Sequence, residues 1–303
     1  MNNAARIGVF GAGLGLAFGA AFGVGRVMDP VLDEEQRAAP SDHGADHGAD
    51  HGAGHGGQEE EGGTEGGGAG SGAGAEVPGG LQVSERGYTL AAPAEALPAG
   101  EETDFRFRIL GPDGEPWREY RTEHEKDLHL IVVRRDLSGF QHVHPTLGED
   151  GTWSTPLTFE EAGAYRVFAD FVPVGDPGGG LTLGADVAVA GDYEPRPLPE
   201  PEATTTVDGY EVSMDGTLAA GGESELAFSV ARDGEPVTDL EPYLGADGHL
   251  VALREGDLAY LHVHPGESLT FHAEAPSAGT YRLYLDFQHD GTVHTAEFTV
   301  HAH

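Results

Sequence analysis

Two H-x-H pairs at matching positions are the residues of this sequence most capable of chemistry. They lie in QHVHPT at 141–146 and in LHVHPG at 261–266, in a chain that contains 16 histidines. Residues two apart on a β-strand face the same side, with Cα atoms about 7 Å apart. Two imidazoles at that spacing can converge on one ion, so the pairs indicate metal coordination through ring nitrogens.

A third histidine precedes each pair on an apolar segment. LHLIVV (128–133) and FQHVH (140–144) flank a short polar turn, which predicts an antiparallel hairpin. In a register centred on the turn, the numbers of opposed residues sum to about 273, which sets His129 opposite His144 with His142 on the same face. The same arithmetic in the second copy, with a sum of about 513, sets His249 opposite His264.

The sequence therefore predicts one Asp/His cluster in each copy. The first cluster contains Asp127, His129, His142 and His144, with His124 as an additional ligand. The second contains Asp247, His249, His262 and His264, with His289 and His294 as additional ligands. Imidazole and carboxylate ligands suit divalent metals, with copper bound most tightly, so copper is the first expectation and zinc the second. The chain has no cysteine, which excludes thiolate ligands and disulfides.

Two alternatives compete with metal binding without turnover. In the first, Val143 and Val263 fill the core, the histidines are incidental, and the protein is a non-catalytic interaction module. The second is a cupin-like metalloenzyme. Residues 256–264 fit the start of the G-x5-H-x-H signature, but Glu267 arrives one residue too early; Glu149 is suitably spaced after His144, but Asp136 stands where the glycine is required. The preferred interpretation is a protein that is not an enzyme.

An internal repeat must position these residues. DLHLIVVRRDLSGFQHVHP (127–145) aligns with DGHLVALREGDLAYLHVHP (247–265), and EEAGAYRVFADF (160–171) aligns with PSAGTYRLYLDF (276–287). Short apolar runs between Gly, Pro and Asp turns predict strands. We expect two tandem immunoglobulin-like antiparallel β-sandwich domains, 84–192 and 207–303, joined by a proline-rich linker at 193–206.

Two details of the aligned strands add to this prediction. The A-G-x-Y strings around Tyr165 and Tyr281 resemble the tyrosine corner of immunoglobulin-like domains, in which the phenol bonds back to the backbone. Asp170 and Asp286 follow Arg166 and Arg282 by four residues, so each pair shares a face of its strand and is expected to form an ion pair.

The N-terminus predicts export. Residues 7–25 form an uncharged apolar run after Arg6 and before an acidic flank, which is long enough for one membrane helix with the following domains outside the cytoplasm. We expect residues 1–28 to be a single-pass anchor in the cell membrane, or a signal whose cleavage gives a secreted protein. Residues 29–83 are expected to form a disordered linker that binds metal weakly through His43, His47, His51 and His55.

The charge of the chain limits its partners. It has 52 Asp and Glu against 16 Lys and Arg, a formal net charge of −36. Such a surface repels nucleic-acid backbones and attracts cations. We therefore expect metal ions and, through the N-terminal helix, the membrane as partners, and no nucleic acid.

KDLHLIVVRRDLSGFQHVHP and YLGADGHLVALREGDLAYLHVHP resemble strings of uncharacterised membrane-anchored secreted proteins of actinobacteria that are loosely described as heavy-metal-associated. The resemblance covers about residues 110–300 and implies an envelope location. A looser similarity, through fold class and histidine usage, connects the chain with immunoglobulin-like copper-handling proteins of the bacterial envelope. The chain lacks the C-x-x-C and methionine-rich motifs of Cu(I) carriers, which argues against a Cu(I) chaperone role.

Overall fold

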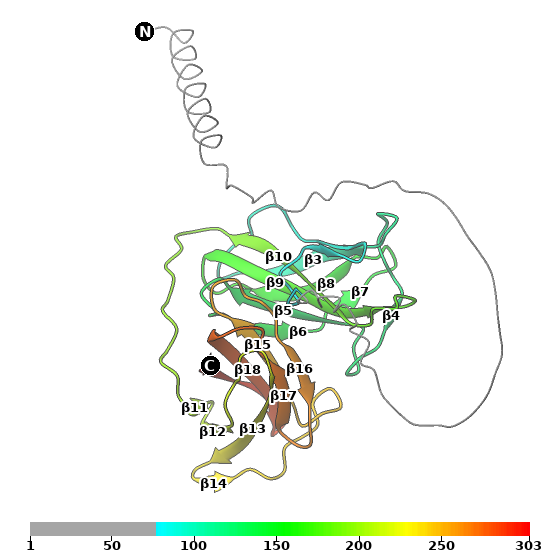
Figure 1. Ribbon diagram of the computed structural model, residues 1–303. Coiled ribbons are helices and arrows are strands. Elements are labelled where there is room, and N and C mark those ends of the chain that lie inside the picture. The colour runs from blue at the N-terminus through cyan, green and yellow to red at the C-terminus, as the bar shows by residue number, and fades with distance from the viewer. Residues whose placement is uncertain (1–76) are drawn as a thin grey trace, which may run out of the picture. The chain divides into compact units, whose positions relative to one another are not determined.

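The computed structural model describes residues 77–303, which lie within one compact unit. In this part of the chain every regular element is a β-strand, and all strands that pair do so in antiparallel fashion (Figure 1). Residues 77–303 contain no helix of the length and apolar character that a membrane span requires. The expected anchor at 1–28 and the linker histidines His43, His47, His51 and His55 lie outside the described residues.

The first repeat consists of two packed sheets. One sheet has the spatial order β1 (Ser84–Glu85), β2 (Tyr88–Ala91), β3 (Glu102–Leu110), β8 (Trp153–Thr158) and β7 (Thr146–Leu147). The other has the order β10 (Leu181–Val189), β9 (Gly163–Pro173), β5 (Leu128–Arg134) and β6 (Gln141–Val143), with β4 (Tyr120–Arg121) also paired to β9. Residues of both sheets, among them Phe105, Trp153 and Val167, meet in one buried core.

The second repeat has the same two-layer plan. Its first sheet has the order β11 (Thr204–Val207), β12 (Tyr210–Asp215), β13 (Glu223–Arg232), β17 (Thr270–Glu274) and β16 (His262–Pro265), with β14 (Glu235–Pro236) also paired to β13. Its second sheet has the order β15 (Gly248–Arg254), β18 (Gly279–His289) and β19 (Thr292–Ala302). Phe228, Leu283 and Phe298 lie in its core. The prediction of tandem β-sandwiches is confirmed.

Both tyrosine corners are present. The hydroxyl of Tyr165 donates to the carbonyl of Glu161 at 2.9 Å, and that of Tyr281 donates to the carbonyl of Ser277 at 2.8 Å. Both rings are almost fully buried. Each phenol therefore fixes the chain four residues upstream of the tyrosine, just before its strand begins, as the A-G-x-Y strings predicted.

The two repeats contact each other through a third apolar cluster. Strand β5 is buried on both faces, because Leu130 and Val132 point into their own sandwich whereas Ile131 and Val133 point toward the second repeat. Leu253 and Tyr284 of β15 and β18 meet them there. The ring of Tyr284 stacks on Phe140 with centroids 3.9 Å apart, and its hydroxyl donates to the carbonyl of Leu137 at 2.6 Å.

Residues expected to be linker take part in this arrangement. The carbonyl of Gly79 accepts from the amide of Tyr260, and the amide of Gly80 donates to the carbonyl of Thr182. The guanidinium of Arg166 also donates to the carbonyl of Gly80. The prediction that residues 29–83 are disordered throughout is therefore wrong for its last part, because backbone partners in both repeats bind this segment.

Candidate metal centre

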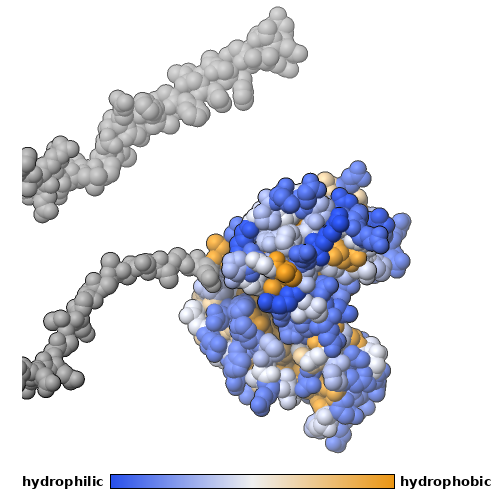
Figure 2. All heavy atoms as spheres, turned by 90° about the vertical axis from the view of Figure 1, so that its right-hand side faces the viewer, coloured by the Kyte–Doolittle hydropathy of each residue, from blue (hydrophilic) through white to orange (hydrophobic). Residues whose placement is uncertain are grey.

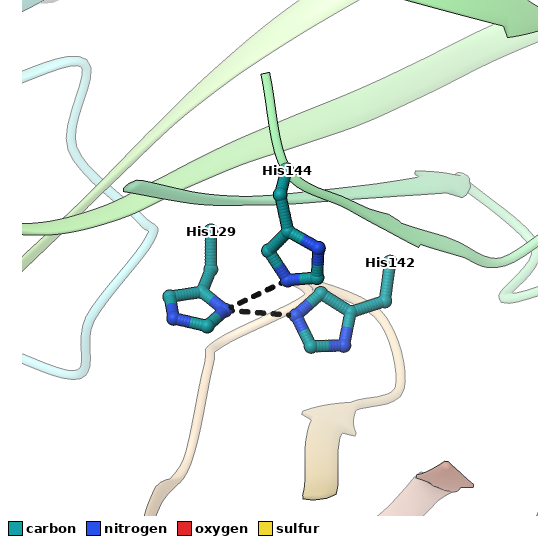
Figure 3. A group of neighbouring side chains, drawn as sticks. All are labelled: His129, His142 and His144. Atoms are coloured by element: carbon teal, nitrogen blue, oxygen red, sulfur yellow. Dashed lines mark hydrogen bonds between the residues drawn. The ribbon is translucent and has the colours of Figure 1, made fainter. Parts of the chain in front are cut away.

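Three histidines of the first repeat converge beside the contact between the repeats (Figure 3). His129 Nδ1 lies 3.1 Å from His142 Nε2 and 3.2 Å from His144 Nε2. We call His129, His142 and His144 the three-histidine group. Each offers a ring nitrogen, and these nitrogens all lie within 4.8 Å of one another.

The hairpin between β5 and β6 produces this convergence. Leu130 pairs with Val143 and Ile131 with His142, which is the predicted register in which residue numbers sum to 273. That register places His129 opposite His144. Val143 packs against the core, so the residues on either side of it turn to the other face of β6, toward His129. The predicted hairpin and its register are confirmed.

Hydrogen bonds fix which nitrogen of each ring carries the proton. His142 Nδ1 donates to the carboxylate of Asp286 at 2.8 Å, and His129 Nε2 donates to the carbonyl of Glu123 at 3.2 Å, because both oxygens can only accept. In the neutral rings, His142 Nε2 and His129 Nδ1 therefore carry lone pairs, and these lone pairs face each other. His144 Nε2 lies 3.2 Å from His129 Nδ1 and can donate its proton to that lone pair. A cation bound among the three nitrogens would interact favourably with all of them.

Burial favours the uncharged form of two of the three rings, His129 and His144. The side chain of His129 is 8% exposed. Burial, and secondarily the neighbouring His142, lowers the pKa of His129 from 6.5 to about 3. Burial, followed by His142 and His129, lowers the pKa of His144 to about 3 as well. Both imidazoles therefore have unprotonated nitrogens at neutral pH, the state that a metal ion requires.

Asp286 comes from the other repeat. Its side chain and that of His142 are only 3% and 5% exposed, and its second oxygen accepts from the hydroxyl of Thr295 at 2.6 Å. The expected ion pair between Arg282 and Asp286 is wrong, since Arg282 pairs with Glu297. The corresponding pair in the first repeat is wrong too, because Arg166 pairs with Asp186. A carboxylate that accepts from a histidine's second nitrogen orients that ring and makes it a better ligand.

His124 and His249 lie next to the three-histidine group without belonging to it. The ring of His249 is centred 6.1 Å from His142 and 5.3 Å from His124, which is itself 6.1 Å from His129. His249 Nε2 donates to the carbonyl of Tyr243 at 2.8 Å, the same arrangement that His129 has with Glu123. Burial lowers the pKa of His249. The structure thus places the equivalent histidine of the second repeat beside the first cluster.

The second cluster does not assemble as expected. Tyr260 still bridges to Leu253 in the register that sums to 513, but the chain then leaves β15, and His262–Pro265 pairs with β17 in the opposite sheet. His249 therefore does not meet His262 or His264. The connection from the H-x-H pair to the tyrosine corner is four residues shorter in the second repeat. It runs from His144 to Tyr165 in the first repeat and from His264 to Tyr281 in the second. With too few residues for a separate strand equivalent to β7, the HVHP segment occupies that place in the sheet.

The remaining candidate residues lie outside the group. Asp127 is exposed and accepts from the hydroxyl of Thr122, and Asp247 is exposed. His289 bonds to the hydroxyl of Tyr210, and His294 bonds to the carboxylate of Asp208. Glu149 and Glu267, the carboxylates of the cupin comparison, are also exposed.

A groove of about 1190 Å³ runs along this side of the unit. Its walls come from both repeats and include His124, His129, His142, His249 and His262. Asp170, the residue of β9 that corresponds to Asp286, also lines it and accepts from the hydroxyl of Thr182 at 2.9 Å. Burial raises the pKa of Asp170. The groove therefore gives solvent a route to the three-histidine group.

The repeated unit defines the class to which the chain belongs. A family described as a domain of unknown function, DUF8832, matches residues 82–193 and again residues 205–303. The chain belongs to this family and carries two copies of its domain. No curated protein matches the sequence.

Solved structures with matching arrangements are distant. One is a Corynebacterium diphtheriae protein named as a candidate membrane-anchored protein. It is 12% identical with a TM-score of 0.23, and the match covers 72% of this chain and 57% of that one. Invasin, a bacterial integrin-binding protein, is 14% identical with a TM-score of 0.21 and coverages of 71% and 39%. The FN1–FN3 domains of chicken CNTN1 are 12% identical with a TM-score of 0.21 and coverages of 70% and 69%. The chain thus spans little more than half the length of the first of these proteins.

Proposed function

We propose that this protein binds a divalent metal ion at His129, His142 and His144 and buffers or handles that ion without catalytic turnover. The observation that carries the proposal is the convergence of the three rings, in which His129 Nδ1 lies 3.1 Å from His142 Nε2 and 3.2 Å from His144 Nε2. Ring nitrogens held this close together can bind one metal ion between them, each through its lone pair.

The surroundings support a cation. The carboxylate of Asp286 holds the ring of His142 and supplies negative charge close to the ligands. The chain as a whole carries a formal charge of −36, and the face drawn in Figure 2 is mostly hydrophilic, with hydrophobic residues in scattered spots. Cations are therefore attracted toward the protein over long range.

The ligand set favours copper first and zinc second. Three imidazoles without a thiolate or thioether suit Cu(II) and Zn(II), and Cu(II) binds nitrogen ligands more tightly. The metal preference is part of the proposal and is tested by competition between the two ions.

The proposed location is the outer side of the cell membrane. It is supported by the uncharged apolar run at residues 7–25, which is long enough for one membrane helix. In that location the groove is exposed to metal ions that arrive from outside the cell.

The decisive experiment is a zinc and copper titration of the full chain in detergent. Since the linker histidines could also bind metal, His43, His47, His51 and His55 are replaced by alanine in every variant. We expect His142→Ala to abolish the tightest binding event seen by calorimetry.

His294→Ala is the matched control. His294 is similarly buried, at 7% exposure, and its Nδ1 also bonds to an aspartate at 2.8 Å, but it lies outside the three-histidine group. Its replacement should leave the tight binding unchanged. Equal binding by His142→Ala and by its parent would end the proposal.

A further inference from the structure

The sheet switch of the second repeat creates another histidine cluster. Strand β16 pairs with β17 so that His264 stands directly opposite His272 and Val263 opposite Ala273. Val263 and Ala273 pack in the core. His262, His264 and His272 therefore share the outer face of the sheet, since alternate residues of a strand point to opposite sides.

Rotation of their side chains would bring these three histidines close enough to bind one ion. The rings of His262 and His264 have centroids 4.1 Å apart. Directly opposed residues on neighbouring strands have Cβ atoms about 4.5–5.5 Å apart, which puts His272 within reach of His264. His262 and His264 are exposed and His272 is half-buried, so their rings can rotate to converge on a ligand.

Carboxylates surround the cluster. Glu274 stands opposite His262, and Glu225 stands opposite His272 on β13. An oxygen of Glu223 lies 3.9 Å from His272 Nδ1. A divalent cation bound by the imidazoles would therefore lie in a field of negative charge.

We propose that His262, His264 and His272 form a second, exposed binding site for a divalent metal ion such as Cu(II) or Zn(II). His262 also lines the groove that reaches His129 and His142, so both sites open onto the same groove. Because its side chains must be ordered on binding and remain in water, the exposed site binds more weakly and exchanges faster than the buried one.

The test measures the two sites separately in the full chain, with the four linker histidines replaced by alanine. Zinc is added in steps, exposed histidines are modified with diethyl pyrocarbonate, and the modified peptides are quantified by mass spectrometry. We expect zinc to protect His262, His264 and His272 from modification at least fivefold, and His272→Ala to remove the protection of the other two. Equilibrium dialysis should show one zinc fewer in that variant.

The C-terminal H-x-H pair provides the control. His301 and His303 are exposed with ring centroids 6.2 Å apart, but His301 stands opposite Thr280 instead of a histidine. His301→Ala should leave zinc stoichiometry unchanged. Protection of His262 and His264 that persists in His272→Ala, or no protection in the parent, would overturn the second site. Protection of His262, His264 and His272 that survives in His142→Ala shows that the exposed site binds zinc independently of the three-histidine group.

Discussion

Replacing Asp286 with asparagine tests the link between the repeats most directly. Asparagine has nearly the same shape and retains one oxygen that can accept from His142 Nδ1, while its amide group can face the hydroxyl of Thr295. Asp286→Asn therefore removes the charge and keeps the contacts. We expect it to weaken zinc binding at the three-histidine group.

The geometry limits the size of the effect. The carboxylate lies 2.8 Å from His142 Nδ1. Adding the width of the ring and a metal–nitrogen bond of about 2.0–2.1 Å places an ion at Nε2 about 7 Å from the charge. At an effective dielectric constant of about 20, a divalent ion and a unit charge at that distance attract by about 5 kcal/mol, which is an upper bound. Carboxylates in this position typically change metal affinity by about 10- to 100-fold, and we expect a loss in that range.

The assay is zinc competition against a chromophoric chelator, in the full chain with the linker histidines replaced by alanine. Asp208→Asn is the matched control, because the Asp208 carboxylate also lies 2.8 Å from a histidine Nδ1, that of His294, which is outside the three-histidine group. Denaturant unfolding of each metal-free variant shows whether the fold is retained. Affinity of Asp286→Asn within threefold of the parent, or an equal loss in Asp208→Asn, would refute the reasoning.

Three further predictions concern the metal-free fold. The pKa values of His129 and His144 are about 3 in the folded state against 6.5, so as the pH falls from 6.5 to 5 the unfolded chain takes up protons that the folded chain does not. The free energy of unfolding should fall with a slope that rises to about 1.4 kcal/mol per pH unit for each histidine near pH 5, and a His129→Asn/His144→Asn variant should lose this slope in denaturant titrations. Tyr284→Phe leaves the carbonyl of Leu137 without its donor and should cost about 1–3 kcal/mol in thermal unfolding, whereas Tyr193→Phe, at an exposed position, should cost nothing measurable. Gly184→Ala would place a Cβ 2.0 Å from the carbonyl oxygen of Gly80 and should release residues 79–82 to proteolysis, whereas Gly180→Ala, with no atom within 4 Å, should be cleaved no faster than the parent.

Local patterns in the sequence were sufficient for much of the architecture. The repeat, the tyrosine corners and the β5–β6 register follow from periodicity and turn chemistry, which act over a few residues. The convergence of His129, His142 and His144 follows from that register.

What the sequence reasoning missed depends on contacts between the repeats. Asp286 bonds to a residue 144 positions away, and no local spacing reveals that partner. A signal was nevertheless present, since LHLIVV is apolar on both faces, as expected of a strand that is covered on both sides. The sheet switch at β16 was also readable, because the second repeat is four residues shorter between its H-x-H pair and Tyr281.

The duplication makes the two repeats interdependent. The first repeat contributes the hairpin with His142, and the second contributes the strand with Asp286. Removing one partner of this buried hydrogen bond while the repeats stay together leaves the other partner unsatisfied, which typically costs about 1–3 kcal/mol. Separating the repeats would expose Asp286 and His142 to water along with the apolar cluster around Tyr284. If Asp286 strengthens metal binding at the three-histidine group, then by thermodynamic linkage metal binding strengthens the contact between the repeats by the same free energy.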